Sequence, residues 1–282
     1  MYLDKVAIDY LKHTDLSKIF TKYFVSEQTN KSINLKGRGD EFLEHREYHY
    51  GDELKNINWK LFAKTGKLYV KTFSSNVSKD VFIALDVSKS MSAGRKISKL
   101  EYSKYLLTVV AYKLTTLGYR VYFSAFDSKF YRLFSFDERN FSKIQDTLTN
   151  IDVNSETNFR GILKELPRFI NSASNILFIS DFLFITTEEI YKLRLLLPKN
   201  DIVFFHIVAE EEVSFPRENE FLEFIDPETS IKRVFSVSEI YNEYQDKLSK
   251  FFDNLYKATK DSKIPLITFN TSTPYYVILR QI

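Results

Sequence analysis

The stretch VFIALDVSKSM, residues Val81–Met91, decides the fold of this chain. Five consecutive apolar residues lead into an acidic residue, and two serines follow at alternate positions. A short apolar run rich in β-branched and aromatic residues is typical of a strand buried on both faces, as in a parallel sheet. Ligands of open parallel sheets bind beyond the carboxyl ends of the strands. Asp86, Ser88 and Ser90 therefore stand where a binding site would form.

Further apolar runs repeat this pattern, and segments with helical spacing lie between them. Leu106, Val110, Leu114 and Leu117, for example, are spaced as on one face of a helix. Strands that alternate with helices predict an α/β fold, a doubly wound, mostly parallel sheet of the Rossmann type. We expect the other strands at Val121–Phe126, Ile176–Ile179, Ile202–Val208 and Pro265–Phe269, an antiparallel edge strand at Phe130–Phe134, and a long helix at Ser236–Lys260.

The N-terminal part of the chain has a different texture, which divides the sequence into three parts. Residues 1–30 have roughly helical spacing and form an N-terminal helical segment. Residues 31–76 form a β-rich N-terminal extension, in which LYVKTF (68–73) alternates as a half-exposed strand does. Residues 77–282 form the α/β domain. We expect Trp59 and its aromatic neighbours to be a small hydrophobic core that joins the extension to the sheet.

Composition excludes several classes of protein. The chain of 282 residues is 44% hydrophobic and 16% aromatic, which is ample for a packed core and argues against disorder. It has no cysteine, so disulfides, thiolate catalysis and zinc–sulfur sites are excluded. The net charge of +3 is too small to indicate nucleic-acid binding. No apolar run approaches the ~20 residues that span a bilayer, and we expect a soluble cytoplasmic protein.

Two carboxylates and three hydroxyls form a candidate metal site. Asp181 follows the Ile176–Ile179 run, and Thr157 in SETNFRG immediately precedes a predicted helix. If the strands before Asp86 and Asp181 are neighbours, both carboxylates face one crevice. Alternation would point residues 86, 88 and 90 the same way while the chain stays extended. A set of oxygen donors alone suits a hard divalent cation, Mg²⁺ first and Mn²⁺ or Ca²⁺ next.

The pattern resembles a known metal site. Asp86-Val87-Ser88-Lys89-Ser90, with Thr157 and Asp181 downstream, is similar to the metal-ion-dependent adhesion site (MIDAS) of von Willebrand factor type A domains. The resemblance implies that Ser88, Ser90 and Thr157 coordinate the ion directly, while Asp86 and Asp181 act directly or through water. It also implies that one coordination position is left for an acidic residue of a protein partner.

A second resemblance covers more of the chain, and it rests on a series of spaced residues. These are Gly37 to Phe42, Arg46, Tyr48, Gly51, Asp52, Ile57 to Trp59, Ala63, Val70, Lys71 and Leu85 to Met91. In spacing they resemble the bacterial domain of unknown function 58 family, whose core is von Willebrand factor A-like. Asn58 and Lys64 depart from the family pattern, which has Asp and Arg there. The resemblance implies a partner of the MoxR-type AAA+ ATPase class.

Other interpretations of the same residues stay open. Asp86, Ser88 and Ser90 would be ordinary capping residues if Thr157 and Asp181 lay elsewhere, and His206 fits a core position in its apolar strand. We expect a metal-dependent protein-interaction module, an adaptor for a MoxR-type ATPase in protein remodelling or maturation, with no catalytic activity of its own. The alternative is a metal-dependent hydrolase that uses the same oxygen cluster. A hydrolase needs a general base near the metal-bound water, and the sequence nominates none.

Overall fold

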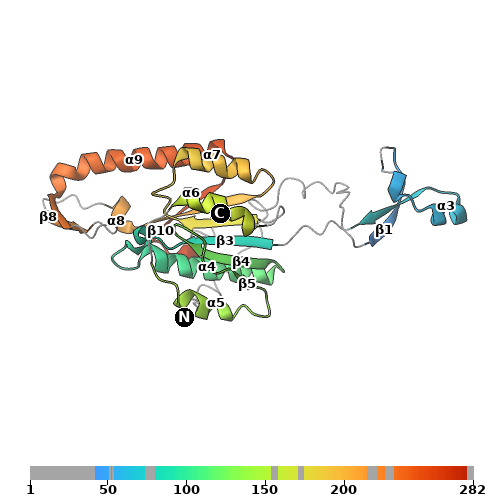
Figure 1. Ribbon diagram of the computed structural model, residues 1–282, viewed down its shortest axis with the longest axis horizontal. Helices are drawn as coiled ribbons and strands as arrows, with labels where there is room; N and C mark the ends of the chain where they lie inside the picture. Colours follow the sequence, from blue (N-terminus) through green and yellow to red (C-terminus); the bar gives the residue numbers. More distant parts are fainter. Residues whose placement is uncertain are drawn as a thin grey trace. The chain divides into compact units, whose positions relative to one another are not determined.

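The computed structural model describes residues 42–50, 52, 54–73, 80–153, 158–170, 175–214, 221–225 and 232–277. The chain divides into two compact units, which are shown in Figure 1. One unit comprises Ser26–Lys79, and the other comprises Met1–Val25 with Asp80–Ile282. The expected helical segment at residues 1–30 lies outside the described residues. Each unit is described by itself below.

A six-stranded sheet forms the centre of the larger unit. Its strands are β3 (Asp80–Asp86), β4 (Arg120–Phe126), β5 (Phe134–Phe136), β6 (Asn175–Ser180), β7 (Ile202–Val208) and β10 (Leu266–Asn270). Their order across the sheet is β10-β7-β6-β3-β4-β5. All neighbouring pairs are parallel except β4 and β5, which are antiparallel. The expected doubly wound, mostly parallel α/β sheet is confirmed.

The strand order reverses between β3 and β6, which is where open α/β sheets generally form a ligand-binding crevice. The chain passes from β3 to β4 and β5, and then returns to the other side of β3 for β6, β7 and β10. Open α/β sheets bind ligands at such a point, outside the carboxyl ends of the strands. Asp86 is the last residue of β3, and Asp181 directly follows its parallel neighbour β6. The expectation that these two acids follow adjacent parallel strands is confirmed.

Helices cover both faces of the sheet (Figure 1). Val81, Ile83 and Leu85 of β3 belong to the core on one face, and Phe82 and Ala84 belong to the core on the other. This alternation explains why β3 is apolar throughout. One face carries α4 (Lys99–Thr116) and α5 (Lys143–Thr149), and the other carries α6 (Phe159–Glu165), α7 (Thr187–Leu196) and α9 (Val237–Asp261).

None of the helices in the described part of the chain is both long and apolar enough to cross a membrane.

Short elements connect the layers of the larger unit. Two strands, β8 and β9, pair antiparallel outside the main sheet. The connecting elements are the 3₁₀ helices η2 (Lys89–Ser92) and η3 (Leu166–Arg168), the one-turn helix α8 (Glu210–Val213), β8 (Phe221–Ile225) and β9 (Lys232–Ser236).

The antiparallel edge strand exists but starts later than its sequence predicts. The sequence places it at Phe130–Phe134, and the structure forms β5 at Phe134–Phe136. The cause is the buried carboxylate of Asp127, which accepts hydrogen bonds from the Lys129 amide (3.2 Å) and the Tyr131 hydroxyl (2.5 Å). These bonds hold the chain in a turn after β4, and Phe130 then forms an isolated antiparallel bridge with Phe126. Regular pairing with β4 begins at Phe134.

In the described residues of the smaller unit, an antiparallel pair of strands is accompanied by a 3₁₀ helix and a short α-helix. The Asn58 side chain caps the helix by accepting a hydrogen bond from the Leu61 amide (3.1 Å), so Asn serves here as well as the family's Asp would. Trp59 is 60% exposed, so it is not part of a core within the smaller unit, and its expected contact with the sheet stays a prediction. It is the first residue of a short helix with no buried residue, and its ring meets the edge of Phe62. The elements are β1 (Phe42–Glu47), η1 (Leu54–Asn56), α3 (Trp59–Thr65) and β2 (Tyr69–Phe73).

Gly94 shapes the loop that joins η2 to α4, and we expect Gly94→Ala to destabilise the protein. Its backbone φ of +128° is one that residues other than glycine rarely adopt. A Cβ added at this position would clash with the Ile97 carbonyl oxygen. The free energy of unfolding should fall on the order of 2 kcal/mol. Urea unfolding measures the change, with Ser92→Ala in the exposed part of the same loop as control. Equal stability of Gly94→Ala and wild type would contradict this account.

Candidate functional site

Asp86 is held inside the carboxyl edge of the sheet by hydrogen bonds from two directions. The residue is only 2% exposed. Its Oδ1 accepts a hydrogen bond from the Ser88 amide at 2.9 Å, and its Oδ2 accepts one from the Ser180 hydroxyl at 2.6 Å. Ser180 is the last residue of β6, so this second bond links the ends of the two central strands. The carboxylate therefore has a fixed position at the point where the strand order reverses.

The two serines come together by a turn of the chain. The Ser88 and Ser90 hydroxyl oxygens lie 3.0 Å apart, and both side chains are buried. The expectation that the chain stays extended through residue 90 was wrong. The chain enters the 3₁₀ helix η2 directly after Ser88 because the Asp86 carboxylate binds the Ser88 amide and turns the backbone. The turn, rather than strand alternation, makes the pair of hydroxyls.

Asp181 is the second buried carboxylate of the crevice. Its Oδ1 accepts a hydrogen bond from the Leu183 amide at 3.2 Å, and its Oδ2 accepts one from the Lys99 ammonium at 2.7 Å. The next residue, Phe182, has a φ of +53°, a conformation that is strained for a bulky side chain. Its ring is buried and stacks on Phe204, with ring centroids 4.4 Å apart. This packing offsets the strain and fixes the turn that presents Asp181.

Lys99 belongs to the site, although the motifs of the sequence do not include it. It is the first residue of α4 and is completely buried. Its ammonium lies 2.7 Å from Asp181 Oδ2 and 2.7 Å from Glu212 Oε1 of α8. A lysine at the start of a helix opposes the helix dipole, which is the one local signal that could have marked it. The two partners are far away in the sequence, so the pairing itself had no signal.

Burial and charge shift the protonation of these groups. Burial, with a further contribution from the charge of Asp181, raises the pKa of Asp86 from 3.8 to about 6. Burial alone would lower the pKa of Lys99, but the charges of Asp181 and Glu212 raise it above its usual value. Lys99 is therefore a permanent cation at neutral pH. Lys99 pairs with Asp181 and Glu212. Burial and the charge of Asp181 disfavour the ionised form of Asp86.

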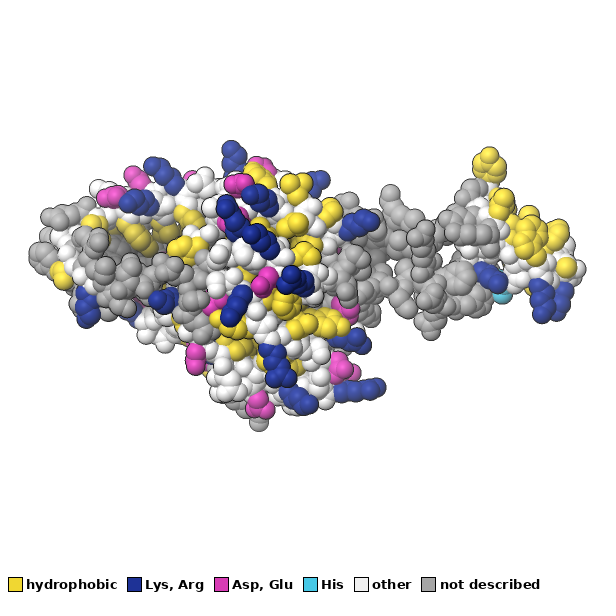
Figure 2. All heavy atoms as spheres, in the orientation of Figure 1, with side chains coloured by type: hydrophobic (Ala, Val, Ile, Leu, Met, Phe, Trp, Pro, Cys, Tyr) yellow, Lys and Arg dark blue, Asp and Glu magenta, His cyan; other side chains and the backbone are white. Residues whose placement is uncertain are grey.

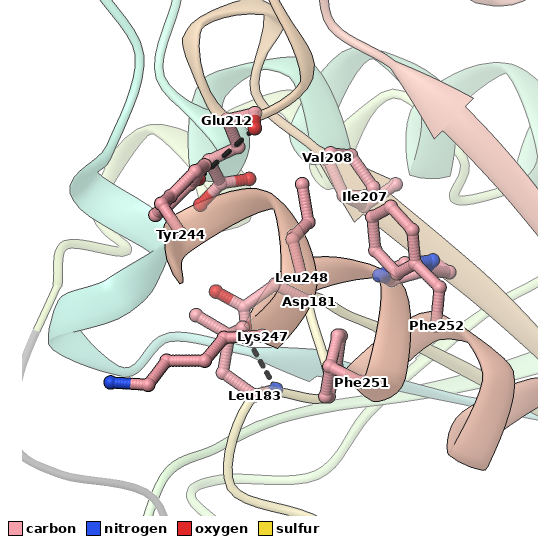
Figure 3. Close-up of a pocket in the computed structure, with 11 residues that line it drawn as sticks. Asp181, Leu183, Ile207, Val208, Glu212, Tyr244, Lys247, Leu248, Phe251 and Phe252 are labelled. Atoms are coloured by element: carbon pink, nitrogen blue, oxygen red, sulfur yellow. Dashed lines mark hydrogen bonds between the residues drawn. The ribbon is translucent and has the colours of Figure 1, made fainter. Parts of the chain in front are cut away.

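A largely apolar cavity of about 410 Å³ adjoins Asp181 (Figure 3). In Figure 3 the Glu212 carbonyl accepts a hydrogen bond from Tyr244, at 3.0 Å, and the amide of Leu183 donates to Asp181. Burial lowers the pKa of His206 in the cavity wall to about 4, so this imidazole is neutral at pH 7. The apolar lining residues are Leu183, Ile207, Val208, Leu248, Phe251 and Phe252.

The donors that the structure brings together suit a hard cation in chemistry. Two carboxylates, Asp86 and Asp181, and two hydroxyls, Ser88 and Ser90, gather at the ends of β3 and β6, with oxygen as the only donor element. Thr157, the fifth expected ligand, lies outside the described residues. In the described part of the chain, no three His, Asp or Glu side chains gather as a metal site. An ion bound here would therefore need the serine hydroxyls.

A comparison of the whole chain with known protein families identifies its family. The family described as "Protein of unknown function DUF58" matches residues 44–250, about three quarters of the chain. The chain belongs to this family. The match includes Asp86, Ser88, Ser90 and Asp181, together with Lys99. No curated protein matches this DUF58 chain.

Solved structures similar to this DUF58 chain include proteins with von Willebrand factor type A domains. An aerotolerance-related membrane protein from Bacteroides fragilis is 16% identical, with 72% of this chain and 96% of that chain covered, at a TM-score of 0.42. The SpRpn10 VWA domain is 11% identical, with 72% of this chain and 94% of that chain covered, at a TM-score of 0.43. A von Willebrand factor type A protein from Catenulispora acidiphila is 17% identical, with 50% of this chain and 35% of that chain covered, at a TM-score of 0.39. At such scores the fold assignment rests on the strand order described above.

We expect Asp86→Asn to stabilise the metal-free protein at a pH of about 8 and to leave its stability almost unchanged at about pH 4. Because the pKa of Asp86 is raised to about 6 in the folded state, ionisation of Asp86 penalises folding as the pH rises through that value. The gain in free energy of unfolding should be on the order of 2 kcal/mol at the higher pH. Denaturant unfolding in chelator across this pH range measures it, and parallel pH profiles for the two proteins would contradict it.

Proposed function

We propose that this DUF58 protein is a metal-dependent protein-interaction module whose docking point is the crevice between β3 and β6. The observation that carries the proposal is the position of Asp86 and Asp181 at the point where the strand order reverses, beside the paired hydroxyls of Ser88 and Ser90. Buried strands and short hydrogen bonds hold these groups in place before any partner arrives. Such preorganisation lowers the entropy cost of binding.

Mg²⁺ is the ion proposed for the site, with Mn²⁺ or Ca²⁺ as substitutes. Ser88, Ser90, Asp86 and Asp181, together with Thr157, would hold it. When bound, the ion supplies a positive charge that can recruit a carboxylate from another protein. Serine hydroxyls carry no negative charge, so this donor set neutralises a cation less than a cage made only of carboxylates would.

The proposed partner is a protein that presents an acidic residue. We propose a MoxR-type AAA+ ATPase or its client as this partner, as the resemblance in sequence implies, with the protein acting as an adaptor in remodelling or maturation in the cytoplasm. Figure 2 shows basic side chains interspersed with acidic and hydrophobic ones on the drawn face of the larger unit. This mixture, like the net charge of +3, favours a protein partner over a nucleic acid.

The same oxygen cluster would also serve a metal-dependent hydrolase, which is the alternative function. A hydrolase needs a general base near the metal-bound water, with a pKa near the working pH. The titratable imidazole in the cavity wall, His206, has a pKa lowered to about 4 and is buried against aromatic rings. It is a weak base at neutral pH. This observation supports binding rather than catalysis.

We expect the double substitution Ser88→Ala, Ser90→Ala to weaken partner binding at least about tenfold while the fold stays intact. The two hydroxyls are bonded to each other, so removal of both leaves no unpaired hydroxyl. Asp86 keeps its hydrogen bonds from the Ser88 amide and the Ser180 hydroxyl, while the ion loses two ligands. The measurement is calorimetric titration with the MoxR-type ATPase of the same cell, in Mg²⁺ and in chelator.

The matched control is Ser92→Ala in the same loop, where the hydroxyl is exposed and donates to the Lys89 carbonyl oxygen. This variant should bind as the wild type does. If the double variant and the wild type bind the partner equally in both buffers, the crevice is not the docking point. Hydrolysis of phosphate or carboxylate esters by wild type in Mg²⁺, abolished in the double variant, would favour the alternative function.

A further inference from the structure

The ammonium of Lys99 lies in the position of a cation within the candidate metal site. It is 2.7 Å from one oxygen of Asp181 and 2.7 Å from one oxygen of Glu212, and the whole side chain is buried. Buried charges are stable only when paired and hydrogen-bonded. The arrangement satisfies Lys99 with two carboxylates. It also gives Asp181, one of the proposed metal ligands, a full positive charge before any ion binds.

The placement of Lys99 is not the ordinary behaviour of a surface lysine. Lys96 lies in the loop just before α4 and pairs with Glu210, which like Glu212 belongs to α8. Its side chain is 83% exposed, however, and its ion pair is longer, 3.4 Å. Lys99 instead sits at the first position of α4, where the helix dipole opposes a positive charge. The chain therefore accepts an unfavourable local position for this charge, and the buried carboxylate of Asp181 and the partly buried carboxylate of Glu212 account for it.

We propose that Lys99 is a built-in cation of the site, which neutralises Asp181 while no divalent ion is bound and must be displaced from Asp181 when one binds. Glu212 gives the displaced ammonium a second carboxylate, so Lys99 stays paired after the exchange. The displacement of Lys99 by a divalent ion rests on the proposed function. The neutralisation of Asp181 by Lys99 does not, because it needs only Lys99, Asp181 and Glu212.

The exchange would reach beyond the metal ligands. Glu212 is held at three points: its Oε1 accepts from Lys99, its Oε2 accepts from the Ala209 amide at 2.8 Å, and its carbonyl accepts from Tyr244 of α9 at 3.0 Å. The Lys99 ammonium thus links the residue after β6 to α8, and Glu212 of α8 in turn accepts a hydrogen bond from Tyr244 of α9. A change of partner at Asp181 alters the force on α8, which borders the apolar cavity. Ion binding and the shape of that cavity are therefore coupled through Lys99.

The test is Lys99→Met, which keeps the length and apolar character of the side chain but removes the charge. Mg²⁺ should bind the variant at least about tenfold more tightly than wild type, because no internal cation competes for Asp181. In chelator, the melting temperature of the variant should fall by about 10 °C, since Asp181 and Glu212 are left without their counter-charge. Saturating Mg²⁺ should restore much of that loss. Calorimetry and thermal unfolding measure the two effects.

Two further variants keep the test decisive. Lys96→Met removes a neighbouring exposed positive charge and should change neither Mg²⁺ affinity nor melting temperature. The double variant Lys99→Met, Asp181→Asn removes the opposed charges together, so in chelator it should melt within a few degrees of wild type even if Lys99→Met alone does not fold. A double variant as unstable as the single one would show that Lys99 acts through packing, which overturns the inference.

The outcomes separate this inference from the proposed function. If wild type and Lys99→Met bind Mg²⁺ equally and Mg²⁺ restores no stability, Lys99 does not compete with the ion, and the inference is overturned while Ser88 and Ser90 still test the docking point. If neither protein binds Mg²⁺ but the double variant recovers stability, the metal-dependent function fails. In that case Lys99 is the permanent cation of the site.

Discussion

The ion pair between Lys99 and Asp181 is the interaction on which the functional end of this protein depends. The two charges are buried at 2.7 Å from each other, and removal of one partner from such a pair costs about 3–5 kcal/mol because the other is left uncompensated. The same ammonium binds Glu212 of α8. One side chain therefore fixes the start of α4, the end of β6 and the position of α8, which together frame the crevice.

The sheet makes that concentration of charge possible. Parallel strands buried on both faces end at one edge, so the acids that follow β3 and β6 must meet there. Apolar side chains pack on either side of β3 and leave the carboxyl ends as the place where polar groups can gather. Ser180 at the end of β6 then binds Asp86 at the end of β3, so hydrogen bonding continues the alignment of the strands into the site.

The site is charged in an uneven way, and this bears on what it can bind. Asp181 already has a cation beside it, whereas burial raises the pKa of Asp86 to about 6. Two serine hydroxyls bonded to each other lie nearby and add donors without charge. A ligand that brings positive charge toward Asp86 would offset the free-energy cost of burying its ionised carboxylate. His206, in the wall of the neighbouring cavity, has a pKa lowered by burial to about 4 and is a weak base at neutral pH.

The sequence by itself determined the sheet, because a strand buried on both faces must be apolar at every position, as Val81–Leu85 is. It also predicted that Asp86 and Asp181 each follow a buried strand, and that a long helix and a further strand, α9 and β10, come after the other strands of the sheet. That the strands before the two acids are neighbours is a result of the tertiary structure. The sequence pattern did not show how the ends of these elements bend. The Asp127 carboxylate holds a turn after β4, and the Asp86 carboxylate turns the chain after Ser88, each by a hydrogen bond from a backbone amide two residues further on. Only the tertiary structure decided the pairing of Lys99 with Asp181 and Glu212. Local patterns follow backbone periodicity and side-chain burial within one element, whereas this pairing joins side chains more than 80 residues apart, which no local period records.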